Sequence, residues 1–202
     1  MTEPVPTDDI DGRTLRRERG RSAVTDAMIE LVLEGHLPPS VEQLASRAGV
    51  SVASVFRYFD GLDDLRRAAT EVYFERYADL FEIPQIGEGT RADRIDRIVE
   101  VRLRLYLVAG PMGRLVRIRA HDDEAVRASL ARLRLTYADQ IRHHFDTELA
   151  ARSTEEQSDL VGLAATLTSF ESWEQLREHL GRTDADIARS WTQALTHLFT
   201  AT

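Results

Sequence analysis

The sequence predicts an all-α protein of about nine helices. Apolar residues recur at helical intervals of three and four along most of the chain, and no strand-like alternation of apolar and polar residues occurs. Serine or threonine stands three positions before an acid ahead of several of these segments, as in the capping boxes that begin helices. Glycines and prolines mark the interruptions. A fold built from helices alone accounts for all three patterns.

In the first third of the chain, four helices are expected. The first follows a basic run and ends near Gly35. Two short helices come next, capped by Ser40 and Ser51, because a serine hydroxyl can accept a bond from a first-turn amide. An acidic first turn favours a fourth helix over about 62–81.

The remaining helices are delimited by caps and breakers. Thr90 opens a helix that Gly110-Pro111 is expected to end, leaving a separate short segment over 112–120. Asp122-Asp123 begins a long helix, and Ser153 begins another that Gly181 ends. The last expected helix starts at Thr183.

Composition suggests three regions. Residues 1–12 are acidic, contain two prolines and predict a flexible tail. An N-terminal domain is expected over 13–65 and a C-terminal domain over 66–202. The stretch PQIGEG, at 84–89, is the clearest linker, and the helix before it is expected to be shared by both domains.

The strongest local pattern lies between Pro39 and Leu65. Gly49 stands between the two short helices, where the chain must adopt a left-handed conformation that glycine takes at little steric cost. Two short helices joined by such a turn predict a helix-turn-helix, whose second helix enters the major groove of DNA.

This stretch resembles the DNA-binding motif of the tetracycline-repressor (TetR) family. The matching residues are Leu44, Ala45, Ala48, Gly49, Val50, Ser51, Phe56, Phe59, Asp63, Asp64 and Leu65. Phe56 and Leu62 stand where the family commonly has tyrosine and lysine, so two phosphate contacts are lost. The resemblance implies a three-helix DNA-binding head and a helical body that binds a small molecule and forms a homodimer.

Recognition is expected from the turn and the second helix of the motif. Arg57 is the candidate for a bidentate guanine contact, and a surface salt bridge is the alternative for it. Val55, Phe56 and Phe59 are expected to pack inward. The residues expected to contact DNA are Arg17, Arg21, Ser40, Ser51, Val52, Ala53, Ser54, Arg57 and Tyr58.

The net charge of −8 opposes DNA binding, but the charge is unevenly distributed. Residues 13–59 contain seven arginines and five acidic residues, so this region carries a small positive net charge. All 26 basic residues are arginine, whose rigid fork suits phosphates and guanine edges. A local positive patch is sufficient for phosphate binding.

The resemblance also implies a small-molecule cavity in the body, although the same aromatic side chains could simply fill a core. The residues expected to bind the ligand are Tyr73, Tyr77, Arg102, Tyr106, Met112, Tyr137, Phe170 and Trp173. Few charges accompany these rings, which favours a largely apolar or aromatic effector. Arg102 is expected to reach outward over this pocket. If it is buried instead, it needs an acid such as Glu100 or Glu171, or a ligand carboxylate.

The last two helices carry more apolar residues than a single subunit requires, and the resemblance implies that they form a four-helix dimer interface. The expected interface residues are Leu160, Leu167, Trp191, Leu195 and Leu198.

The combined interpretation is a cytoplasmic transcriptional repressor. It is expected to bind a near-palindromic double-stranded DNA operator as a homodimer and to be released by the effector. One alternative is a regulator without an effector that acts through a protein partner, and the other is a helical enzyme or ligand carrier. No catalytic motif, cysteine, signal peptide or membrane span is evident, and His121 and its acidic neighbours are better explained as helix ends than as metal ligands. We therefore expect no enzymatic activity, no cofactor and no membrane association.

Overall fold

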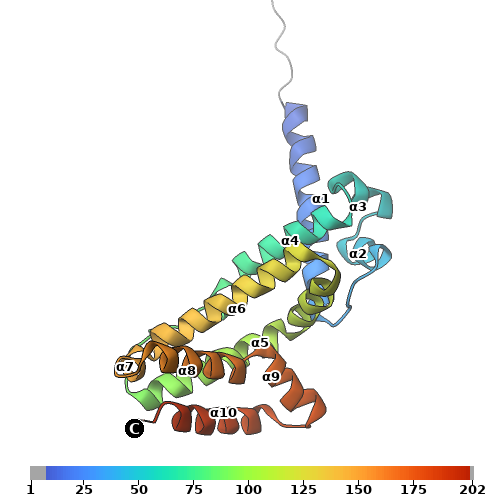
Figure 1. Ribbon diagram of the computed structural model, residues 1–202. Helices are drawn as coiled ribbons and strands as arrows, with labels where there is room; N and C mark the ends of the chain where they lie inside the picture. Colours follow the sequence, from blue (N-terminus) through green and yellow to red (C-terminus); the bar gives the residue numbers. More distant parts are fainter. Residues whose placement is uncertain (1–7, 201–202) are drawn as a thin grey trace, which may run out of the picture. The chain divides into compact units, whose positions relative to one another are not determined.

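The computed structural model describes residues 8–200, which contain ten α-helices and no β-strand (Figure 1). The prediction of an all-α protein is confirmed. The chain divides into two compact units, Met1–Ala78 and Asp79–Thr202, which we call the first and the second unit. None of the described helices is both long enough and apolar enough to cross a bilayer.

The first unit packs four helices around one apolar core. They are α1 (Asp8–Leu33), α2 (Val41–Ala48), α3 (Val52–Tyr58) and α4 (Leu62–Arg76). Val24, Leu44, Val55 and Leu65 come one from each helix, and none is more than 1% exposed. Gly49 ends α2 with a φ of 67°, so the left-handed turn predicted between α2 and α3 is present.

The N-terminal boundary differs from the expected one. Residues 8–12, predicted as part of a flexible tail, form the first turns of α1, and residues 1–7 of that tail lie outside the described part of the chain. The compact units divide after Ala78, so α4 belongs to the first unit, whereas the sequence placed all but its first turn in a domain over 66–202.

The second unit is built on two long helices, α5 (Arg91–Asp122) and α6 (Glu124–His144), which run antiparallel and side by side (Figure 1). The other elements from residue 78 onward are the 3-10 turn η1 (Ala78–Leu80), α7 (Asp146–Leu149), α8 (Thr154–Leu167), α9 (Phe170–Glu174), the π-helical segment η2 (Gln175–His179) and α10 (Asp184–Leu198). α10 packs on α5, and α8 contacts both α6 and α10. Ile98, Ile141 and Trp191 are fully buried where these helices meet.

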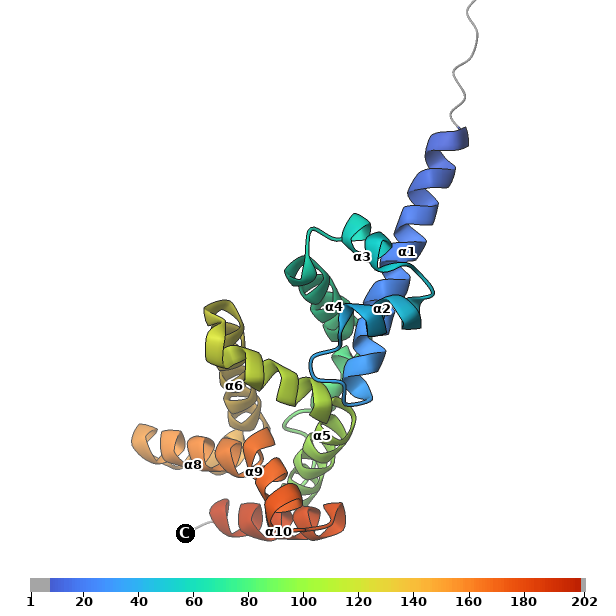
Figure 2. The ribbon, with the colours of Figure 1, turned by 90° about the vertical axis from the view of Figure 1, so that its right-hand side faces the viewer.

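One predicted helix break is wrong, because α5 continues through Pro111. A proline inside a helix removes one hydrogen bond and forces a bend, and α5 changes direction along its length (Figure 2). Gly110 lets Trp173 approach closely here, since a Cβ atom at Gly110 would lie 3.2 Å from the indole. Packing of this kind outweighs the local preference to break the helix.

The opposite error occurs farther on, where one helix was predicted from Ser153 to Gly181. Thr168 and Ser169 interrupt it after α8. The Thr168 hydroxyl donates to the Ala164 carbonyl at 2.9 Å, and Ser169 accepts from the Ser172 amide and so caps α9. These local bonds compete with the helical ladder and restart the helix.

Four of the helices in residues 8–200 begin with a complete capping box, in which the cap side chain and the third helical residue bond each other's backbone amides. The four pairs are Ser40/Gln43 in α2, Thr90/Asp93 in α5, Ser153/Glu156 in α8 and Thr183/Asp186 in α10. The predicted starts of these helices are therefore confirmed.

A buried polar cluster joins the start of α5 to the end of α6. Arg94, 5% exposed, donates to the Gly89 carbonyl at 2.7 Å and forms an ion pair with Glu148. His144 is fully buried; its Nδ1 accepts from the Gly87 amide, so its Nε2 carries the proton and donates to the Arg94 carbonyl at 2.8 Å. Burial lowers the pKa of His144 to about 4.

This histidine predicts a loss of stability in mild acid. An unfolded histidine has a pKa near 6.5, so between about pH 6.5 and 4 the proton binds to the unfolded state but not to the folded one, and this binding stabilises the unfolded state. We expect the free energy of unfolding to fall by on the order of 3 kcal/mol across this window, measured by urea denaturation at several pH values.

Comparison of two variants isolates the contribution of His144. His144→Gln should flatten this part of the pH profile, whereas His143→Gln, on an exposed neighbour, should leave it unchanged. Equal slopes in the two variants would contradict the assignment.

Candidate functional site

The outer face of α3 is the candidate DNA-reading surface. Val52 and Phe56 are 38% and 51% exposed, and Arg57 and Ala53 are exposed beside them. Val55 and Phe59 point inward, as predicted, but the inward packing expected for Phe56 is wrong. Phe56 lies one position after Val55 and therefore about 100° around the helix, away from the core. The position of Phe56 relative to Val55 on α3 therefore indicates exposure, although its apolar side chain suggests the core.

Hydroxyl groups line the start of this surface. The Ser51 hydroxyl accepts from the Ser54 amide at 3.1 Å, and the two serine Oγ atoms lie 3.0 Å apart. The Arg57 guanidinium donates to Ser54 Oγ at 3.0 Å and lies 5.3 Å from the centre of the Tyr58 ring. Arg57 therefore lies along α3 with no acid bonded to it among the described residues, so the alternative of a surface salt bridge is not what the structure shows.

Two residues expected to contact DNA also hold α3 against α1. The Arg21 guanidinium donates to the Tyr58 carbonyl at 2.8 Å and lies 4.3 Å above the Phe59 ring. The Tyr58 ring is half-buried on Gly20, where a Cβ atom would lie only 2.5 Å from the ring. Through these contacts within the first unit, Arg21 and Tyr58 each help to fix the orientation of α3.

The other expected contacts lie at helix starts and on the projecting end of α1. Ser40 is exposed and forms its capping box with Gln43. Arg17 is exposed in α1, so the basic run is helical there. Arg47, by contrast, is bonded to Glu30 and Glu34, which reduces its availability to phosphate. Arg57 and the exposed arginines of the first half of α1 therefore supply positive charge near the motif.

The residues expected to form one ligand cavity fall into two groups. Tyr73 and Tyr77 belong to the first unit, with ring centres 4.8 Å apart, and the others belong to the second. Tyr106, Phe170 and Trp173 are at most 4% exposed and pack on one another with ring centres 5.4–5.8 Å apart. The Tyr106 hydroxyl donates to the Thr168 carbonyl at 2.8 Å. These three rings therefore pack against one another inside the second unit.

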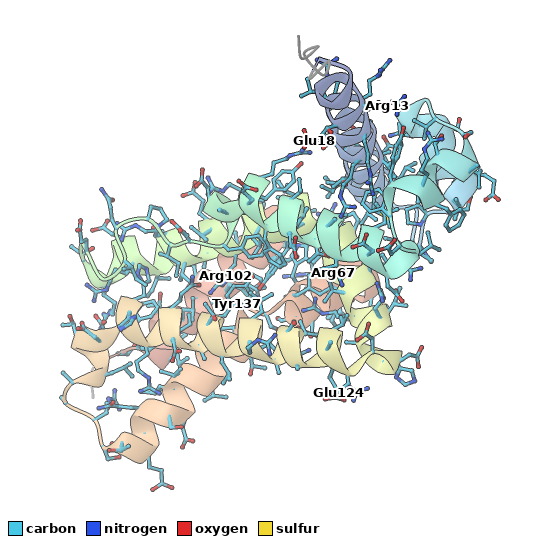
Figure 3. All side chains as sticks on the ribbon, turned by 90° about the horizontal axis from the view of Figure 1, so that it is seen from above. Arg13, Glu18, Arg67, Arg102, Glu124 and Tyr137 are labelled. Atoms are coloured by element: carbon cyan, nitrogen blue, oxygen red, sulfur yellow. The ribbon has the colours of Figure 1, made fainter. Side chains whose placement is uncertain are left out.

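Arg102 does not follow its expected outward course. Its side chain is 1% exposed and lies between α5 and α6 beside Tyr137, with the guanidinium 4.0 Å from the centre of that ring (Figure 3). Its Nη2 donates to Gln140 Oε1 at 2.8 Å. The expectation of a snorkelling arginine is wrong because the neighbouring α6 covers this face of α5.

An open groove of about 590 Å³ lies elsewhere on the second unit, between α5 and α10. Leu103, Leu107, Val108 and Ala188 are among the residues that line it. None of the residues expected to bind the ligand lines this groove, although Met112, one of them, is half-buried farther along α5.

The expected dimer residues differ in accessibility. Trp191 and Leu195 are fully buried within their own subunit, so assigning them to an interface is wrong. The others, Leu160, Leu167 and Leu198, are half-buried. Leu163, which is 58% exposed on α8, was not among the expected interface residues, although it lies three positions after Leu160.

No group of three or more His, Cys, Asp or Glu side chains within reach of one metal ion occurs among residues 8–200.

Comparison with known proteins relates the chain by its fold. No family model matches the sequence, and no curated protein matches it. A TetR-family transcriptional regulator from Streptomyces coelicolor is similar, with a TM-score of 0.71 and 20% identity, over 90% of this chain and 80% of that one. A putative TetR-family transcriptional regulator from Rhodococcus sp. is similar with a TM-score of 0.60 and 20% identity, over 91% of this chain and 100% of that one. A TetR transcription regulator from Haloarcula marismortui is similar with a TM-score of 0.59 and 18% identity, over 92% of this chain and 96% of that one.

Proposed function

Starting from the TetR-type fold of this chain, we propose that it is a transcriptional repressor. It binds a near-palindromic operator as a homodimer through α3 and is released by a small molecule bound in the second unit. The observation that carries the proposal is the outer face of α3, where Arg57 and Phe56 are exposed beside the capping Ser51 and the half-buried Ser54, on a helix fixed by buried neighbours.

The chemistry of this face suits the major groove. A guanidinium can donate two bonds to a guanine edge, and exposed apolar side chains such as Val52 and Phe56 can contact thymine methyl groups. Ser40 stands at the N-terminus of α2, where amides and a hydroxyl can meet a phosphate. Arg17 adds positive charge on α1, which supports phosphate contact.

Dimerisation is proposed on the exposed part of α8. Leu163, 58% exposed, and the half-buried Leu160 and Leu167 lie at helical spacing on this element. An isologous contact through α8 gives the two-fold symmetry that a near-palindromic operator requires.

The test is selection of DNA fragments from a random pool, followed by binding measurements on the enriched sequence. Arg57→Ala should weaken binding by about 1–3 kcal/mol and relax the preference at one base position per half-site. Arg17→Ala should weaken all sequences about equally and reduce the salt slope by about one. Arg189→Ala, which removes an exposed arginine of α10, serves as the control and should change neither the base preference nor the salt slope.

Failure to enrich any motif would overturn the proposed function. An Arg57→Ala protein with unchanged affinity and selectivity would remove only the assignment of that residue.

A further inference from the structure

The guanidinium of Arg102 is a buried cation without a counter-ion. The side chain is 1% exposed, and its Nη1 atom has no hydrogen-bond acceptor among the described residues. Its polar partners are the neutral amide of Gln140 and the face of the Tyr137 ring. A charge held in this way costs folding free energy unless an anion joins it.

The acids that could have paired with Arg102 are occupied or exposed. Glu171 bonds both Arg117 and Arg134; burial opposes its ionisation, but these two hydrogen bonds outweigh it and lower its pKa to about 2. Glu100 is exposed and lines the groove between α5 and α10. Neither carboxylate neutralises Arg102.

The neighbouring tyrosines do not supply a negative charge either. Burial raises the pKa of Tyr137 to about 12 and raises that of Tyr106 as well, so both hydroxyls stay protonated at neutral pH. Gln140 is fixed in its amide orientation, because its NH₂ group donates to the Phe81 carbonyl at 2.7 Å while its oxygen accepts from Arg102. Gln140 therefore orients the cation and leaves Nη1 for another acceptor.

Two further buried donors lie in the same core. Nε1 of Trp173 and Nε1 of Trp191 are both buried and have no hydrogen-bond acceptor among the described residues. Both indoles contact the ring of Tyr106, which is one helical turn from Arg102 on α5. This part of the second unit therefore offers donors without acceptors, in apolar aromatic surroundings.

From this imbalance we infer that Arg102 is the anchor of a site for a small carboxylate with an apolar body. The carboxylate accepts from the guanidinium, and the apolar part lies against the aromatic side chains beside it. The inference rests on the proposed function in that it names the chemical class of the effector. It adds a carboxylate to the largely apolar or aromatic effector expected from the sequence.

The test uses the full chain without DNA, so it does not depend on operator binding. Thermal unfolding is followed with graded carboxylates (acetate, benzoate and octanoate) and with the neutral matches benzamide and octanamide, at constant ionic strength. We expect benzoate or octanoate to raise the melting temperature with increasing concentration while the amides do not. Arg102→Met should weaken carboxylate binding about tenfold or more, and Arg132→Met, which changes an exposed residue of α6, should bind like the parent.

The unliganded variant gives a second, independent readout. If the buried cation serves ligand binding, replacing Arg102 by methionine should leave the stability of the unliganded protein unchanged or raise it. A lower melting temperature for unliganded Arg102→Met, carboxylates that leave the parent protein unchanged, or amides that stabilise it equally well would each overturn the site. If the protein binds no carboxylate but selects operator DNA normally, the Arg102 site is wrong and the proposed DNA-binding function is unaffected. If it binds carboxylates but selects no DNA motif, the DNA-binding function is wrong and the Arg102 site is unaffected.

Discussion

Trp191→Ala is expected to destabilise the second unit by about 3–5 kcal/mol, because it removes a fully buried indole from the contact between α10 and α5. The ring contacts Tyr106, with centres 6.5 Å apart, and its removal leaves a cavity in a core of large rings. Urea denaturation followed by circular dichroism measures the effect.

The matched control is Leu163→Ala on the exposed part of α8. Its unfolding free energy should change little at a fixed concentration, and any effect should appear as weaker dimerisation in sedimentation experiments. If Trp191→Ala weakened dimerisation and left the stability of the subunit unchanged, Trp191 would belong to the interface after all.

Glu148→Ala is expected to cost a similar amount, about 3–5 kcal/mol, because it leaves the guanidinium of Arg94 buried without its carboxylate. The Gly89 carbonyl still accepts from Arg94, but a neutral acceptor does not replace the lost charge. The measurement is again the free energy of unfolding, taken at pH 7.5 so that His144 is neutral throughout.

A double variant separates the charge effect from lost packing. Arg94→Met with Glu148→Leu removes both charges and keeps most of the volume, so it should recover much of the stability lost in Glu148→Ala. Glu155→Ala, on an exposed acid of α8, should be neutral. A double variant as unstable as the single one would show that the ion pair is not the source of the effect.

The fold class and the motif could be predicted from the sequence because their signals are local. A capping residue lies three residues from its partner, and the left-handed conformation of Gly49 is required by the turn in which it stands. The helix-turn-helix residues also lie within one continuous stretch, so their spacing alone fixes which of them face the same way. Only Phe56 was misplaced, because its apolar character suggested the core while its position on α3 directs it outward.

The second unit was less predictable because its deciding contacts are distant in sequence. Whether α5 breaks at Pro111 depends on Trp173, about sixty residues away, which packs on Gly110. The burial of Arg102 depends on α6, and that of Trp191 on α5 and its aromatic residues. Periodicity shows that a face is apolar, but it does not distinguish whether the cover comes from the same chain, a second subunit or a ligand.

The four capping boxes also determine where the chain can change in length. The start of each of these helices is fixed by bonds within four consecutive residues. An insertion in the preceding loop therefore leaves the first turn of the helix, and the side chains that this turn buries, in place. The loops before α2, α8 and α10 are therefore places where the chain can gain or lose residues without shifting the core, whereas the loop before α5 is held by the bonds of Gly87 and Gly89 to the buried polar cluster.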